Sequence, residues 1–202
     1  METLRAEVPE LRRAQALGYP VAGALARLAL ALFSGVGRGP TDLAEYATML
    51  SQAQLRALRF RCLSGTRRVR CPARTTFERV LAAVDAAAVE RAFLCWQAQV
   101  LGPVQVTLVI VDGKAIRRAK VELVSAVSGT GRWLGTVSGA EKSNEISAAR
   151  VLLDKLDVTV KRVLADCLHT QTETAQQILY EGGGDYWLTV KGNQKELVTT
   201  LE

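Results

Sequence analysis

A run of mostly β-branched residues from Val104 to Val111 constrains the fold of this chain more than any other stretch. A nearly continuous run of this kind is typical of a strand buried on both faces. The run ends in Asp112-Gly113-Lys114. Because such a strand must be covered by other elements, the sequence after Gly102-Pro103 predicts an α/β architecture.

The segments after this strand predict which further strands and helices make up the sheet and its covering layer. Their apolar periodicity switches between the period of strands and the period of helices. The expected elements are strands at 120–127 and 132–137 joined by a turn at 128–131, a helix at 144–156, a strand at 159–165, a helix at 170–180, a strand at 185–191, and the start of a helix at 194. Three antiparallel strands followed by alternating helices and strands indicate a mixed sheet with helices on its faces. Residues 101–202 are therefore expected to form one domain.

Residues 1–100 have the apolar spacing of helices and are expected to form a separate helical domain. The expected helices are at 21–36, from Thr41 or Asp42 onward, at 51–60, from Thr75 or Thr76 onward, and at 86–96. The most apolar of them, 21–36, contains Arg27 and is shorter than the roughly 18 apolar residues that a membrane span needs. It also lacks a signal-peptide cleavage site, so we expect a cytoplasmic protein with no membrane partner.

The positive charge of the chain is concentrated near the N-terminus. The sequence has 26 Lys+Arg and 20 Asp+Glu, and residues 1–81 hold 13 of the basic residues but 6 of the acidic ones. Seven arginines occur within nineteen residues that contain no acid, a stretch we call the basic segment (residues 56–74): Arg56, Arg59, Arg61, Arg67, Arg68, Arg70 and Arg74. Guanidinium groups match phosphate oxygens, so the basic segment predicts nucleic-acid binding. A solvated basic loop is the alternative.

Cysteine and histidine are too sparse for a zinc site. Four cysteines occur without a C-x-x-C pair, and His169 is the single histidine of the sequence. Unpaired thiols in a reducing cytosol are expected, with a Cys62–Cys71 disulfide as the alternative in an oxidising environment.

Two aspartates, Asp112 and Asp166, each follow a predicted hydrophobic strand directly. The ends of buried strands open onto the edge of the sheet where ligand sites of α/β folds occur. Two carboxylates on neighbouring strands suit Mg²⁺ or Mn²⁺, which prefer oxygen ligands. The alternative for each residue is a turn or a helix cap.

Five short blocks carry a resemblance to a known family. They are Val111-Asp112-Gly113-Lys114, Leu123-Val124-Ser125-Ala126, Lys142-Ser143-Asn144-Glu145-Ile146, Ala165-Asp166-Cys167-Leu168-His169-Thr170-Gln171 and Val190-Lys191-Gly192-Asn193-Gln194. In this order they resemble the signature blocks of DDE-type insertion-sequence transposases of the ISAs-type or H-repeat-associated group. The N-terminal helical part resembles the domain that precedes the catalytic core in this group.

The resemblance implies a fold, a chemistry and a set of partners. The fold is a ribonuclease H-like mixed sheet, incomplete at the C-terminus, preceded by an all-helical N-terminal domain. Asp112 and Asp166 match the first two catalytic acids and are expected to hold Mg²⁺ or Mn²⁺ for cleavage and strand transfer of DNA. The implied partners are the element ends and target DNA, and the implied location is the bacterial cytoplasm, at the nucleoid.

The sequence also departs from the pattern of the family. The third acid of the family, a Glu on a later helix, has no clear equivalent here, because Glu196 and Glu202 are poor substitutes. Glu122 stands where a His is usual, the stretch between Lys114 and Leu123 looks shortened, and Cys167 stands where Ala is usual. Loss of a metal-bridging carboxylate cripples two-metal chemistry.

These departures leave three interpretations open. The first is a transposase that is truncated before its third acid and impaired by the truncation. The second is a catalytically inactive, transposase-derived DNA-binding or regulatory protein, and the third is another metal-dependent nuclease. An incomplete sheet layer exposes apolar surface, so a homodimer or poor solubility is expected.

The remaining polar residues of the blocks are candidates for accessory roles. Lys114, Lys191 and Asn193 are interpreted as contacts to the DNA backbone. Glu145 is either an accessory acid or a first-turn acid that complements a helix dipole. His169 and Gln171 either touch metal-bound water or DNA or belong to a helix entry with Thr170 as N-cap.

Overall fold

The computed structural model describes residues 1–10, 18–36, 39–103, 105–116, 120–139, 145–192 and 194–201. Asn193, the expected element ends Val104 and Asn144, and the loop residues 37–38 lie outside the described residues. The chain divides into two compact units, Met1–Val100 and Leu101–Glu202. Each unit is described by itself below.

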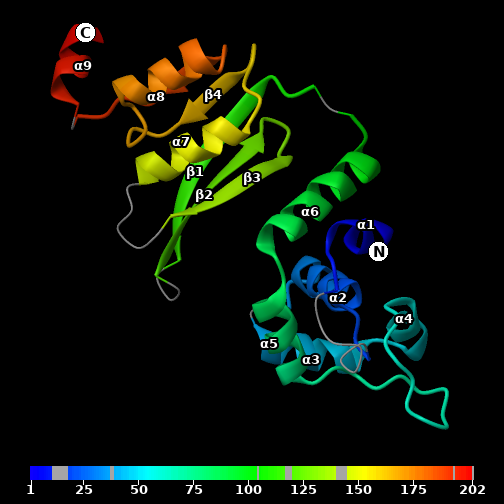
Figure 1. Ribbon diagram of the computed structural model, residues 1–202. Coiled ribbons are helices and arrows are strands. Elements are labelled where there is room, and N and C mark those ends of the chain that lie inside the picture. Colours follow the sequence, from blue (N-terminus) through cyan, green and yellow to red (C-terminus); the bar gives the residue numbers. More distant parts are fainter. Residues whose placement is uncertain are drawn as a thin grey trace. The chain divides into compact units, whose positions relative to one another are not determined.

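The described residues of the first unit contain helices and a single isolated antiparallel bridge, between Cys62 and Val69. The helices are α1 (Glu2–Glu7), α2 (Val21–Phe33), α3 (Pro40–Met49), α4 (Gln52–Ala57), α5 (Arg74–Ala83) and α6 (Ala86–Leu101) (Figure 1). Helix α4 begins with a reciprocal cap, in which Ser51 Oγ accepts from the Gln54 N–H and the Gln54 side chain accepts from the Ser51 N–H.

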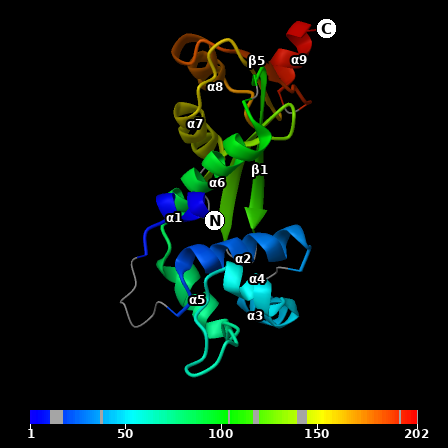
Figure 2. The same ribbon diagram turned by 90° about the vertical axis from the view of Figure 1, so that its right-hand side faces the viewer.

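The main core of the first unit lies between α2, α3, α5 and α6, with α2 beside α3 and α5 in Figure 2. Leu25, Leu43, Phe77 and Val80 are among its buried residues. Arg27 lies in the same interior with no exposed surface, although it is the one charged residue of α2. The helical period of α2 directs position 27 inward together with the apolar residues around it.

The second unit is built on a five-stranded mixed sheet with the order β3-β2-β1-β4-β5. Its elements are β1 (Leu108–Ile116), β2 (Val121–Ser128), β3 (Trp133–Gly139), α7 (Glu145–Lys155), β4 (Arg162–Ala165), α8 (Thr172–Gln176), a π-helical turn at Gln177–Glu181, β5 (Asp185–Leu188) and α9 (Lys195–Leu201). Strands β1 to β3 are antiparallel neighbours, whereas β4 runs parallel to both β1 and β5. The expected mixed α/β architecture is confirmed.

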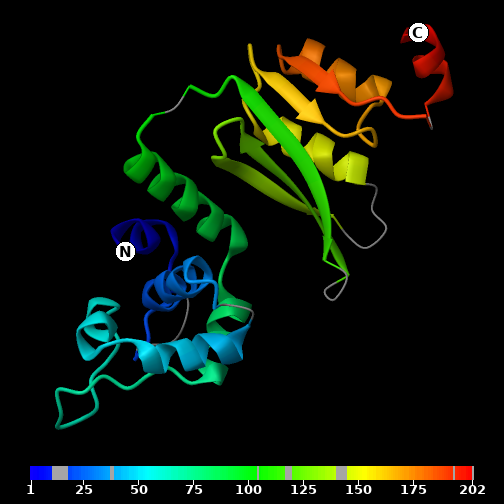
Figure 3. The same cartoon turned by 180° about the vertical axis from the view of Figure 1, so that it is seen from behind.

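One face of this sheet is covered by helices. Val109, Val111 and Val163 point from β1 and β4 into a core with Leu152 of α7 and Ile178 of the π-helical turn. Figure 1 shows α7 and α8 along this face. In Figure 3 the opposite face of β1 is in view, and no described helix of the same unit lies over it.

Strand β1 does not end where the sequence predicts. It starts at Leu108 and continues through Asp112-Gly113-Lys114 to Ile116, so these residues lie within the strand instead of after it. The reason is the ladder with β2, which pairs Asp112 with Ser125 and Lys114 with Leu123. The composition of Asp-Gly-Lys favours a turn, but continuous antiparallel pairing overrides this local preference.

Three predicted helix caps are wrong. Helix α3 begins with Pro40 as its first residue after Gly39, because proline is preorganised for that position, so neither Thr41 nor Asp42 is the cap. Helix α5 follows Ala73 instead of Thr75 or Thr76. Helix α8 follows Gln171, and the Thr170 hydroxyl donates to the Thr189 carbonyl at 2.7 Å.

A helix that crosses a bilayer must be both long and strongly apolar. No described helix is both long and apolar enough to cross a membrane.

Candidate functional site

The register of the sheet brings the two predicted catalytic aspartates to the same level. Parallel pairing of β1 with β4 joins Ile110 to Leu164, and two residues further along each chain stand Asp112 and Asp166. Neighbouring strands lie about 4.8 Å apart. Both aspartates are exposed; Asp112 lies within β1, and Asp166 directly follows Ala165, the last residue of β4.

Asp166 also organises the turn that follows β4. Its Oδ1 accepts a hydrogen bond from the Leu168 N–H at 3.0 Å, and its carbonyl accepts one from the His169 N–H at 3.1 Å. Aspartate favours such turns because its short side chain reaches backbone N–H groups two residues ahead. The turn folds His169 back into the interior.

His169 is buried between two carboxylates. It is 1% exposed, and its Nε2 lies 3.3 Å from Glu145 Oε1 and 3.9 Å from Asp166 Oδ1. Neither distance comes with hydrogen-bond geometry, and neither ring nitrogen has a hydrogen-bond partner among the described residues. A buried polar group without a hydrogen-bond partner lowers stability, so the presence of a histidine at position 169 calls for an explanation other than packing.

Glu145 stands in the first turn of α7 and lies against β1. A Cβ on Gly113 would overlap the Glu145 carboxylate, so the absence of a side chain at 113 is what lets α7 bring this acid so close to the strand. Residues 113, 145, 166 and 169, from three segments of the chain, therefore form one cluster beside β1. Gly113 stands out in the sequence because it follows Asp112 directly, but its contact with Glu145 does not.

The donor chemistry of Asp112 and Asp166 fits a hard divalent cation, because two exposed carboxylates leave room for waters and phosphate. No group of three His, Cys, Asp or Glu residues within the described part of the chain has the geometry of a metal site. All four cysteines are free thiols, so the alternative Cys62–Cys71 disulfide is not formed.

The other block residues lie around the same edge of the sheet. Lys114 and Lys191 are exposed, and Gln171 donates weakly to the Leu168 carbonyl at 3.5 Å. Gln194 is the residue that sequence reasoning missed: its amide donates to the carbonyls of Cys167 at 3.2 Å and Thr170 at 2.9 Å. It ties the turn after Asp166 to the segment after β5.

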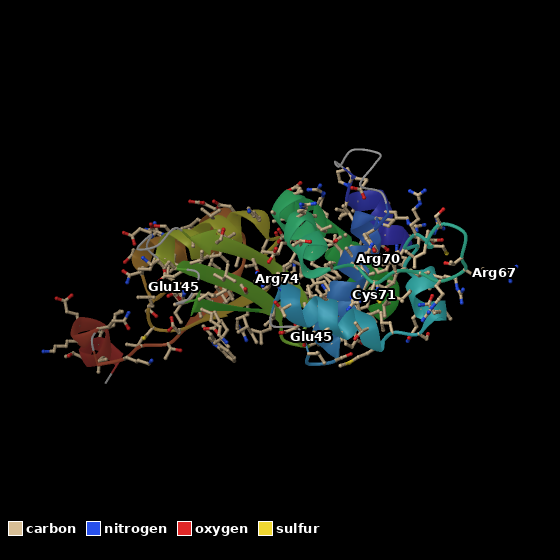
Figure 4. All side chains as sticks on the ribbon, turned by 90° about the horizontal axis from the view of Figure 1, so that it is seen from below. Glu45, Arg67, Arg70, Cys71, Arg74 and Glu145 are labelled. Carbon is tan, nitrogen blue, oxygen red and sulfur yellow. The ribbon has the colours of Figure 1, made fainter. Side chains whose placement is uncertain are left out.

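In the first unit, the structure sorts the seven arginines of the basic segment into two groups. Arg74 pairs with Glu78 at 2.7 Å, and Arg56 donates to the Arg67 carbonyl at 3.2 Å. The side chains of the other five have no hydrogen-bond acceptor or acidic partner within the described ranges, and all are exposed: Arg59, Arg61, Arg67, Arg68 and Arg70. Figure 4 shows Arg67 at the outer edge of the loop that carries it.

The chain is similar to one protein family over its first unit and to several known proteins over about two thirds of its length. The family described as DDE_Tnp_1-associated matches residues 3–97. The putative transposase YncI of Escherichia coli O157:H7 is 33% identical over 140 residues, which are 65% of this chain and 36% of the relative. The H repeat-associated putative transposase YhhI of Escherichia coli K12 is 30% identical over 140 residues, 65% of this chain and 37% of that protein.

A third relative, the H repeat-associated putative transposase YbfD of the same strain, is 29% identical over 140 residues, 65% of this chain and 55% of the relative. The chain thus spans little more than a third of the first two relatives and about half of the third.

Proposed function

The chain belongs to the H repeat-associated group of DDE-type transposases, and we propose that its second unit is a ribonuclease H-like core for metal-dependent DNA cleavage and strand transfer. The observation that carries this proposal is the register of β1 and β4, which brings Asp112 and Asp166 to one level on adjacent parallel strands. The mixed strand order, with helices along one face, is consistent with such a core.

Asp112 and Asp166 would hold Mg²⁺ or Mn²⁺. When bound, the ions would activate an attacking oxygen and stabilise the leaving oxygen of a phosphodiester. Asp112 is anchored by the β1–β2 ladder, and Asp166 by the Leu168 N–H, so both carboxylates leave a rigid backbone. Lys114 and Lys191, exposed at the same edge, would bind the DNA backbone as electrostatic contacts. Asn193 shares this proposed role by its place in the sequence.

Glu145 and His169 would act as positioning residues beneath this pair. The Glu145 carboxylate fills the space above Gly113, and His169 lies between it and Asp166. A buried imidazole with two unpartnered nitrogens can donate to either carboxylate, which would orient Asp166 toward the metal ion.

A DNA-nicking assay in Mn²⁺ tests the core. Wild-type protein is expected to cleave DNA that carries the ends of the element, and Asp112→Ala and Asp166→Ala are each expected to abolish cleavage. Asp157→Asn is the matched control, since it changes an exposed carboxylate outside the site. Cleavage that survives Asp112→Ala contradicts the proposal.

The alternative is a catalytically inactive, transposase-derived DNA-binding or regulatory protein. It is suggested by the departures from the family pattern, such as Glu122 in place of the usual His and Cys167 in place of the usual Ala. Wild-type protein that binds DNA in a salt-sensitive way but never cleaves it would support this alternative.

We propose further that the first unit binds DNA through the unpartnered arginines of the basic segment. Replacing Arg67, Arg68 and Arg70 together with Ala is expected to flatten the slope of log affinity against log salt concentration by about 2–3, because each phosphate contact contributes about 0.9. Arg74→Ala is the control, since Arg74 is paired with Glu78 and should leave the slope nearly unchanged. An unchanged slope in the triple variant contradicts this assignment.

A further inference from the structure

Residues 59–70, which we call the arginine arm, are held in one conformation by helix α4. The Gln52 side chain accepts from the Val69 N–H at 2.7 Å and donates to the Val69 carbonyl at 3.2 Å, as a neighbouring strand would. Val69 is 4% exposed and packs with Leu55 and Phe60. The arm is thus attached to the core at its returning strand.

The arm is also closed on itself. Cys62 and Val69 form an isolated antiparallel β-bridge, and the Leu63 N–H donates to the Arg68 carbonyl at 2.8 Å. Arg56 of α4 donates to the Arg67 carbonyl, which fixes the tip from the side. A preformed arm binds with a smaller loss of conformational entropy than a mobile loop.

Arg59 begins the arm in a backbone conformation that arginine does not favour. Its φ is 58°, in the left-handed region, directly after the C-cap Leu58 of α4. The Arg59 N–H donates to the Arg56 carbonyl at 2.8 Å, and the Phe60 N–H to the Leu55 carbonyl at 3.4 Å. This pattern is the helix ending at which glycine is the usual residue. A non-glycine residue there lowers stability, and such strained positions cluster at functional sites.

The left-handed turn separates two neighbouring side chains. Phe60 is 4% exposed and meets Tyr19 edge-on at 5.4 Å between ring centroids, whereas Arg59 is exposed. Glycine at 59 would keep the turn and the burial of Phe60, but it would remove the guanidinium from the surface. The fold alone therefore does not explain why position 59 holds an arginine.

We propose that the arginine arm is a preformed element that binds the sugar-phosphate backbone of duplex DNA, and that Arg59 is a phosphate contact for which the strained turn is retained. The proposal rests on the DNA binding proposed above and adds to it the residue and the conformation. Arg59 joins Arg61, Arg67, Arg68 and Arg70 as exposed guanidinium groups that have no acceptor within the described ranges. Several exposed guanidinium groups on one hairpin suit contacts to several phosphates of a nucleic-acid backbone.

The substitution Arg59→Gly tests this directly, because its two expected effects have opposite signs. The unfolding temperature of the full chain is expected to rise by about 2–4 °C as strain is relieved. The affinity for duplex DNA is expected to fall roughly fivefold, and the salt slope to flatten by about 0.9. Arg59→Lys keeps the charge and should restore most of the affinity without the thermal gain.

Two matched controls isolate the two effects. Val160→Gly relieves a left-handed backbone with φ of 51° in the second unit, at a side chain that is 91% exposed, and should raise the unfolding temperature without altering DNA binding. Arg79→Ala removes an exposed charge from α5, outside the arm, and should change the affinity less than Arg59→Gly.

The outcomes separate this proposal from the one on which it rests. If Arg59→Gly binds DNA as the wild type does, while the triple variant of Arg67, Arg68 and Arg70 is weakened, the role of Arg59 is overturned and DNA binding by the first unit stands. If wild-type protein shows no salt-dependent DNA binding, the proposed function of the first unit fails and the arm proposal fails with it.

Discussion

Among the described residues, each unit buries one basic side chain, and the two sites differ in what surrounds it. Arg27 in the first unit has no exposed surface, and its guanidinium lies 5.3 Å from the Tyr46 ring centroid and 5.2 Å from that of Phe77. Its Nη2 donates to the Leu43 carbonyl, while Nε and Nη1 have no partner within the described residues. His169 in the second unit lies between the carboxylates of Glu145 and Asp166.

The difference shows how the surroundings of a buried basic side chain indicate its role. Aromatic faces and a carbonyl stabilise Arg27 without fixing an opposite charge, and burial lowers its pKa from 12.5 to about 10. The guanidinium stays charged at neutral pH and joins α2, α3 and α5. His169 lies between an acid in the first turn of α7 and an acid directly after β4, and in the proposed site it would orient these carboxylates.

The largest effect is expected from Arg27→Ala, which should lower the free energy of unfolding by about 3–5 kcal/mol because it leaves a large cavity. Arg27→Met is the matched control: it fills most of the space without a buried charge and should cost less than about 1 kcal/mol. Chemical denaturation of both variants makes the comparison. Equal destabilisation by Ala and Met would show that Arg27 contributes through its charge and not through packing.

His169→Leu is expected to have a smaller effect on folding but a clear effect on metal binding. The apolar side chain removes two unpartnered buried nitrogens, so the unfolding temperature should change little. Affinity for Mn²⁺, measured by calorimetric titration, should fall about 10–100-fold, the range for residues that orient metal ligands. Unchanged Mn²⁺ affinity alongside tight wild-type binding would make His169 a packing residue like Arg27.

Gly113→Ala tests the same cluster from the side of β1. The new Cβ must displace the Glu145 carboxylate, with an expected loss of about 1–2 kcal/mol in the free energy of unfolding. The loss should shrink when Glu145→Ala is also present, which a double-mutant cycle by denaturation would reveal. Strictly additive effects would contradict the close contact.

The smallest expected effect comes from the exposed ion pair between Asp157 and Lys161. Hydrogen bonds from the Lys161 side chain and from Thr159 lower the pKa of Asp157 from 3.8 to about 2. Because the pKa of the folded state is the lower one, the stabilisation is complete above pH 3.8 and is lost as the pH falls through about 2. Asp157→Asn should remove this small pH dependence, as NMR titration and acid unfolding would show, and should leave stability near neutrality almost unchanged.

The sequence predicts much of this molecule because its strands are strongly apolar and its helices regular. The expected strands occur, with shifted ends, and the parallel pairing of β1 with β4 puts Asp112 and Asp166 at the same level, although Asp112 lies within β1 and not at its end. Helix α1 lacked a clear apolar period, and the length of β1 depends on its pairing with β2. Local composition carries no information about such pairing.

The details of the two sites depend on tertiary contacts and could not be predicted. The contact of Glu145 with Gly113 joins residues more than thirty positions apart, and only packing of α7 on β1 brings them together. The backbone of Arg59 is fixed by burial of Phe60, which no arginine pattern indicates. Likewise, Arg56 donates to the Arg67 carbonyl and Arg74 pairs with Glu78. These contacts distinguish the two arginines from the other five of the basic segment, which look equivalent in the sequence.

The exposed thiol of Cys62 has a practical consequence for work on the arm. It lies within the arginine arm beside the Arg67 carbonyl, with a separation of 3.9 Å, and is not in a disulfide. A thiol-specific fluorophore could therefore be attached there without engineering a new residue. Cys95 is also exposed, and Cys71 and Cys167 are half-buried free thiols, so replacing these three with Ser would confine the label to Cys62. Slower labelling of Cys62 in the presence of duplex DNA would report directly on occupancy of the arm.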